Sequence, residues 1–134
     1  MLSILIHQDY NTLIDNNIYP SIAVKIVEHE FSEIGNCVER RNANLRMCSI
    51  SEYSEDKDSE NILVKIGGTP SLIQDEEFYY KELEQQGFSF FLSIDEDGYN
   101  DDVLIGSYPF GYGALYLYKH HITNEIIAGF WQCS

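Results

Sequence analysis

The chain has 134 residues, of which 44% are hydrophobic and 13% aromatic, and its formal net charge at pH 7 is −14. This length predicts a single domain covering residues 1–134, and the hydrophobic content excludes an intrinsically disordered chain. No window approaches the roughly 18 apolar residues of a membrane span, and the first ten residues lack the basic region of a secretory signal. We therefore expect a cytoplasmic protein that does not enter membranes.

The first third of the chain predicts two strands. Residues 2–6 form a short apolar run typical of a strand, and residues 9–17 space their apolar side chains as in one or two helical turns. Residues 22–26 alternate as in a strand, although residues 23–34 could also line one face of a helix. The β-branched content of this stretch favours the strand.

The middle of the chain is polar and then apolar again. Residues 45–50 are a further candidate strand, and the acidic segment 51–61 shows no periodicity, which predicts a solvated loop. Residues 62–66 predict another strand, which ends in the glycine- and proline-containing turn 67–70.

A helix is predicted over residues 75–86. Asp75 is a suitable N-cap, acidic residues fill the first turn, and Gly87 suits the position just after the helix. Glu77 and Lys81 are spaced i, i+4 in the favourable orientation for an ion pair.

The most apolar stretch begins directly after this helix. Residues 88–99 predict a central strand, buried on both faces, that runs into an acidic turn at residues 95–98. Residues 103–105 are a short candidate strand. Residues 108–113 form an aromatic and glycine-rich bend, which we call the aromatic loop.

The C-terminus predicts a hairpin of residues 114–119 and 125–131, joined by a turn at residues 120–124, with one aliphatic and one aromatic face. Together these elements predict an α+β fold: a single domain dominated by antiparallel β-sheet, with one or two helices.

The charge is concentrated in little more than a third of the chain. Residues 52–102 hold 15 of the 22 acidic residues and three lysines, a net charge of −12. Such a surface repels nucleic acid and anionic lipid and attracts basic proteins or cations. The alternative is that the acidity only keeps the protein in solution.

The residues that could carry chemistry give no catalytic pattern. Cys37, Cys48 and Cys133 are too widely spaced for a zinc site or a disulfide framework, and no serine or cysteine lies in a nucleophile motif. We therefore predict no enzyme, no catalytic residue and no cofactor. The acidic turn and Asp101 and Asp102 have oxygen ligands suited to calcium, but their spacing does not match a helix–loop–helix calcium site, so we predict no metal.

The tyrosines of the aromatic loop and hairpin leave two alternatives open. Exposed beside acidic residues, they would form a protein-binding surface, because tyrosine and tryptophan are enriched where binding energy concentrates. Buried, they would belong to the core.

Three runs of sequence resemble one family. Residues 66–74 (IGGTPSLIQ), 90–99 (FFLSIDEDGY) and 111–118 (GYGALYLY) look like the YwqG-like family of bacterial proteins of unknown function. The resemblance covers the C-terminal half, and Gly67, Gly68, Pro70 and Gln74 are its matching positions. It implies an α+β fold rich in antiparallel sheet, supplies no catalytic residues, and suggests a toxin-immunity protein.

These observations favour an immunity-type protein that binds and neutralises a basic partner by occluding its active site, with a nuclease toxin as the favoured partner. The alternative is a small-molecule or calcium-binding domain. The predicted partner-binding residues are acidic or tyrosine side chains in the most acidic part of the chain and in the aromatic loop: Glu76, Glu77, Asp95, Glu96, Asp97, Tyr99, Asp101, Asp102 and Tyr112.

Overall fold

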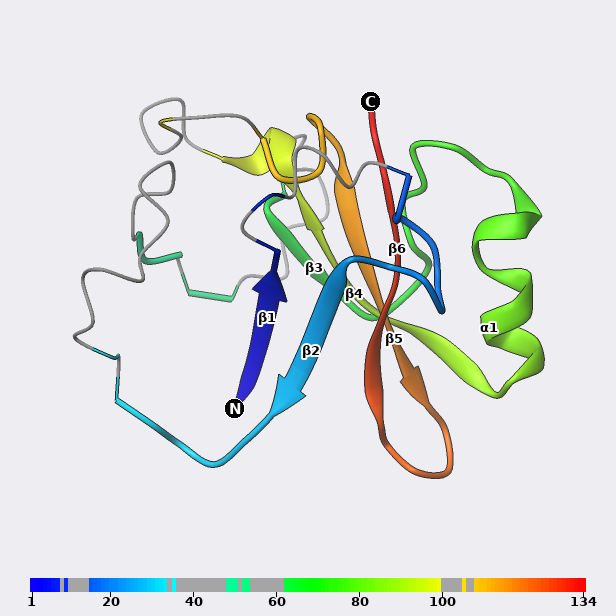
Figure 1. The fold of residues 1–134 in the computed structure, drawn as a ribbon, viewed down its shortest axis with the longest axis horizontal. Helices are drawn as coiled ribbons and strands as arrows, with labels where there is room; N and C mark the ends of the chain where they lie inside the picture. Colours follow the sequence, from blue (N-terminus) through cyan, green and yellow to red (C-terminus); the bar gives the residue numbers. More distant parts are fainter. Residues whose placement is uncertain are drawn as a thin grey trace.

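The computed structural model describes residues 1–7, 9, 15–33, 35, 48–50, 52–53, 62–99, 105 and 108–134. Within these ranges the chain forms six β-strands and three short helical pieces (Figure 1). In chain order they are β1 (Leu2–Ile6), β2 (Val24–Glu28), β3 (Val64–Ile66), the 3₁₀ turn η3 (Glu77–Tyr79), α1 (Lys81–Gln85), β4 (Phe88–Asp95), the 3₁₀ turn η4 (Glu96–Gly98), β5 (Ala114–His120) and β6 (Ile126–Gln132).

The strands make two antiparallel sheets. β3, β4, β5 and β6 lie in this order in a four-stranded sheet, and β1 pairs with β2 in a second sheet. The register of the larger sheet places Ile94 opposite Leu115, and Leu115 opposite Trp131. The predicted α+β fold, dominated by antiparallel sheet with short helical pieces, is therefore confirmed.

The β1–β2 sheet covers the aliphatic face of the four-stranded sheet (Figure 1). Val24 of β2 is buried against a cluster that includes Leu92, Leu117 and Trp131. Alternate residues of β1 and β2 point into this cluster, as expected for strands whose second face meets solvent. The aliphatic side of the predicted hairpin is thus a core.

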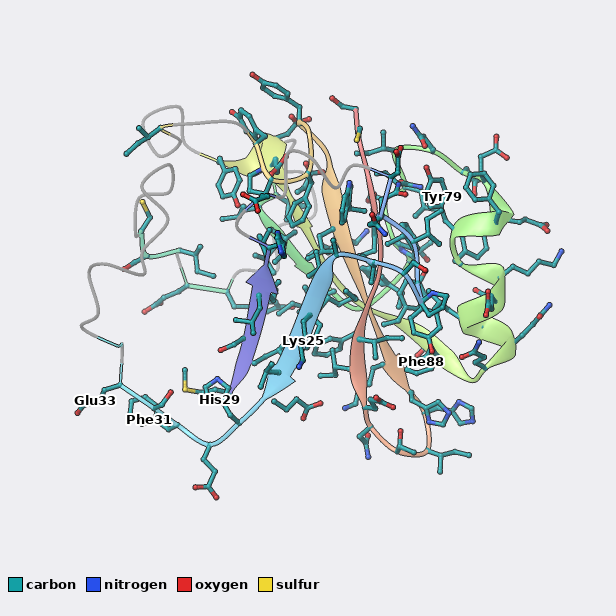
Figure 2. All side chains as sticks on the ribbon, in the orientation of Figure 1. Lys25, His29, Phe31, Glu33, Tyr79 and Phe88 are labelled. Atoms are coloured by element: carbon teal, nitrogen blue, oxygen red, sulfur yellow. The ribbon has the colours of Figure 1, made fainter. Side chains whose placement is uncertain are left out.

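The aromatic face of the same sheet is also a core, covered by η3 and α1. The ring of Tyr79 lies 5.1 Å from that of Phe130, and Phe130 stacks on Tyr116 at 4.7 Å. Figure 2 shows Tyr79 and Phe88 on the side of the strands that faces α1. Tyr116 is 0% exposed and donates a hydrogen bond to the carbonyl of Ser71 at 2.7 Å. Burial raises the pKa of Tyr116 to about 12.

The outer edge of β6 meets the chain segment that leads into β2. Trp131 N–H donates to the carbonyl of Asn17 at 2.9 Å, and Tyr19 N–H donates to that of Gly129 at 2.7 Å. Ile18 forms an isolated antiparallel bridge with Phe130 between these two bonds. Three consecutive residues therefore act as a short cover for the edge of the last strand.

Most predicted strands are confirmed. β1 matches the prediction, and β2 settles the choice at residues 22–26 in favour of a strand. β5 and β6 lie within one residue of their predicted bounds, whereas β3 and β4 are shorter than predicted. The stretch 88–99 does provide a central strand, since β4 has a neighbour on each side.

The helix predicted over residues 75–86 is wrong in extent. Tyr80 leaves helical geometry (φ −120°, ψ −18°), so η3 and the five-residue α1 are separate pieces. Asp75 is not the N-cap, because η3 starts after Glu76, whose side chain makes no capping bond. The predicted pair is present, with Lys81 Nζ 2.6 Å from Glu77 Oε2, and Gly87 has the expected positive φ of 86°.

Several predictions fall wholly or partly outside the described residues. They are the apolar positions of the turns predicted at 9–17, residues 45–47 of the strand predicted at 45–50, most of the loop 51–61, and residues 103 and 104. The described part of 45–50, residues 48–50, is not in a strand. No helix among the described residues is long and apolar enough to cross a membrane.

The position of Leu83 provides a test of the aromatic core. Its side chain is 1% exposed, and its Cδ1 lies over Gly129, where an added Cβ would approach within 2.9 Å. Leu83→Ala should lower the free energy of unfolding by about 2–4 kcal/mol because it leaves a cavity between α1 and the sheet. Chemical denaturation measures this loss.

The matched control is Leu5→Ala on β1, where the side chain is 50% exposed. It should cost less than about 1 kcal/mol, because little apolar area is removed from the core. Equal losses in the two variants would contradict the placement of α1 on the aromatic face.

Candidate functional site

The acidic turn lies directly at the end of β4. Asp95 is the N-cap of η4, and its Oδ1 accepts a hydrogen bond from Asp97 N–H at 3.0 Å. This cap holds the backbone in a 3₁₀ turn and leaves Asp97 exposed to solvent. The aromatic loop, residues 108–113, lies beside this turn at the same end of the sheet (Figure 1).

Glu96 joins the acidic turn to the aromatic loop. Its carboxylate is buried, with 1% of the residue exposed, and accepts hydrogen bonds from Phe110 N–H at 2.9 Å and Gly113 N–H at 3.2 Å. Its own N–H donates to the carbonyl of Gly113 at 2.9 Å. The side chain and the backbone N–H of Glu96 thus hold the aromatic loop through hydrogen bonds to its backbone.

The pKa of Glu96 reflects two opposing effects. Burial removes the carboxylate from water and raises its pKa, the backbone N–H donors lower it, and the charge of Asp95 raises it again. The net result is a pKa of about 7. Desolvation is the larger effect, so the proton equilibrium of this buried group falls near neutral pH.

Gly113 is required by the close approach of the loop to β6. A Cβ at this position would overlap with the carbonyl oxygen of Gln132, a backbone atom that cannot turn aside. Any larger residue would separate the loop from the strand and from Glu96. Gly113 is therefore needed for the close packing of the loop on β6. The turn itself is made by Gly111 and Tyr112, both of which have positive φ.

Three tyrosines form a cluster at this end of the sheet, which we call the tyrosine stack: Tyr99, Tyr108 and Tyr112. The rings of Tyr108 and Tyr112 lie 4.0 Å apart, and those of Tyr99 and Tyr108 lie 6.2 Å apart. Tyr112 is 59% exposed. The stack therefore presents aromatic surface to solvent next to the acidic turn.

The structure groups only some of the predicted partner-binding residues. Asp95, Asp97, Tyr99 and Tyr112 lie together at the end of the sheet, whereas the exposed Glu76 and Glu77 lie on the segment that covers the aromatic face (Figure 1). Asp101 and Asp102 lie outside the described residues.

Glu96 needs a correction. Its buried carboxylate is occupied by the backbone of the aromatic loop, so in this conformation it does not offer a contact to a partner. The sequence does hold a signal for this burial, since Glu96 directly follows β4 and continues the two-residue spacing of Leu92 and Ile94. Tyr108 was missing from the predicted set, although it lies in the predicted aromatic bend.

The alternative of a ligand or metal site gains little here. Among the described residues, no three His, Cys, Asp or Glu side chains are placed to hold a metal ion. A shallow hollow of about 540 Å³ opens on the outer side of α1, away from the hairpin tyrosines, and is lined by Phe78, Lys81, Glu82, Gln85 and Gln86.

Comparisons of this chain with protein-family models, with curated proteins and with solved structures found no match. The resemblance to the YwqG-like family therefore stays a prediction, and the site has to be interpreted from its own geometry.

The buried carboxylate predicts a distinct dependence of stability on pH. Because the folded-state pKa of Glu96 is raised from 4.5 to about 7, the folded protein binds a proton that the unfolded chain releases between these values. This contribution to stability is complete below pH 4.5 and is lost as the pH rises through 7. Its size is on the order of 3 kcal/mol.

Denaturation at several pH values between 5 and 8 measures this effect. The free energy of unfolding of the wild type should fall more steeply with pH than that of Glu96→Gln. Asp97→Asn makes the same change of charge at an exposed neighbour and should keep the wild-type slope. Parallel curves for wild type and Glu96→Gln would contradict the assignment.

Proposed function

We propose that this protein is an immunity-type binding protein that captures a basic protein through the acidic turn and the tyrosine stack. The observation that carries the proposal is the way in which Glu96 holds the two together. Asp97 and Tyr112 are both exposed, and both belong to backbone that the buried carboxylate fixes. A preformed surface of this kind loses little entropy when it binds.

The charge of the chain supports a basic partner. The net charge of −12 over residues 52–102 creates a field that attracts cationic proteins and speeds their encounter. Glu76 and Glu77 extend this field along the exposed segment before α1. The tyrosines supply short-range contact area, which charge alone does not, because exposed charges contribute little once solvated.

Neutralisation would follow from occlusion. An enzyme that cleaves nucleic acid needs a basic cleft to hold its polyanionic substrate. A rigid acidic surface competes with nucleic acid for that cleft because both carry negative charge. The aromatic rings of the acidic surface add contacts that slow its dissociation. A nuclease toxin is therefore the partner class that best fits both the charge of this chain and the resemblance described above.

Co-purification from the native host tests the proposal. The tagged full chain should retain one stoichiometric basic protein at low salt and release it at high salt. With that partner in hand, the association rate should fall by roughly tenfold or more as ionic strength rises, because salt screens steering. The partner's enzymatic activity should also be lost in the complex.

Two double variants distinguish the effect of the acidic turn on the association rate from the effect of the overall negative charge. Asp95→Asn with Asp97→Asn should slow association, and asparagine still caps η4. Glu30→Gln with Glu33→Gln removes the same charge from the extended segment after β2, where Glu33 lies away from the sheets (Figure 2), and should have a smaller effect. An association rate that ignores salt, or a bound partner that stays active, would rule the proposal out.

A further inference from the structure

We infer that the tyrosine stack receives an arginine side chain of the basic partner, with the guanidinium lying on the outer face of Tyr112 and reaching the carboxylates of the acidic turn. This inference rests on the proposed function and names the chemical group that the site recognises.

The first support is the open face of Tyr112. Tyr108 covers one side of its ring at 4.0 Å with 32° between the planes, yet 59% of Tyr112 remains exposed. The ring is therefore backed by a second aromatic ring, while more than half of the residue stays open to solvent. A backed, outward-facing ring is the arrangement on which a planar cation stacks.

The second support is the backbone of Tyr112. Its φ of 62° lies in the left-handed region, which costs an ordinary residue about 1–2 kcal/mol and which glycine or asparagine adopts readily. The loop keeps a tyrosine there, and it holds the backbone through the bonds of Phe110 and Gly113 to Glu96. This cost is explained if the exposed ring has a binding role.

The third support is the charge beside the ring. Asp97 is exposed, and Asp95 uses one carboxylate oxygen to cap η4. A guanidinium combines stacking on an aromatic face with hydrogen bonds to carboxylates, and it is more weakly hydrated than the ammonium group of lysine. Anionic ligands would be repelled at the same place.

Three of the four described lysines make contacts elsewhere. Lys119 lies over the ring of Phe91 at 5.9 Å, Lys81 pairs with Glu77, and Lys65 donates to Ser71. The contact of Lys119 shows that cation–aromatic pairing already occurs elsewhere on this sheet.

Three peptides of equal length provide the probe, each alternating glycine with arginine, lysine or the neutral analogue citrulline. In NMR titrations of the ¹⁵N-labelled full chain, the arginine peptide should bind about threefold or more tightly than the lysine peptide, because it adds stacking. It should shift the amide signals of residues 108–113. The citrulline peptide should not bind.

Three variants assign the effect. Tyr112→Asn suits the left-handed backbone, so it should fold normally while the preference for arginine disappears. Asp97→Asn should weaken both cationic peptides to the same extent. Tyr53→Asn replaces a tyrosine outside the tyrosine stack that is 76% exposed, and it should change neither the affinity for the two cationic peptides nor the preference for arginine.

The outcomes separate this inference from the proposed function. Equal binding of the arginine and lysine peptides, or a preference that survives Tyr112→Asn, overturns the arginine site while leaving acidic capture intact. Tighter binding of a neutral glucan oligosaccharide at the same signals also overturns it. If Asp97→Asn changes neither peptide and no basic protein co-purifies, the proposed function itself fails.

Discussion

The burial of β5 on both of its faces is the constraint on which the rest of the structure depends. Leu115, Tyr116 and Leu117 are all completely buried, and successive side chains of a strand point to opposite sides of the sheet. Each side therefore needs its own cover. The β1–β2 sheet covers the aliphatic side and the η3–α1 segment covers the aromatic side. A helix as short as α1 does not persist alone, so its packing on the strands maintains it.

The sequence predicted the elements whose pattern is local. Alternation identified the hairpin of β5 and β6, and the apolar run after Gly87 identified β4. The helix prediction failed at Tyr80, because the i, i+4 spacing of Glu77 and Lys81 is equally compatible with a 3₁₀ turn followed by a short helix. Which faces would be covered depends on contacts between distant segments, and a local pattern does not contain them. The aromatic face proved to be core.

The candidate site also combines parts that a local sequence pattern predicts with contacts that it does not. The acidic turn and the aromatic bend were both visible in the sequence, but their contact was not. Glu96 is one of 15 acidic residues in its region, and its one distinguishing signal in the sequence is that it continues the spacing of Leu92 and Ile94. Its bonds to the aromatic loop join segments that are distant in the sequence. At neutral pH an ionised carboxylate in this place costs stability. The same carboxylate fixes the geometry of the loop that carries Tyr112, through its bonds to the loop backbone.

The cover on the edge of β6 has a consequence for how the chain avoids association with copies of itself. β6 has the sequence IIAGFWQ, which lacks charge and proline and is typical of segments that stack into cross-β fibrils when their edge is open. Residues 17–19 occupy that edge through backbone hydrogen bonds. The segment before β2 therefore protects the edge of β6 from pairing with another chain. Without this segment, the exposed edge of β6 would be a site of aggregation.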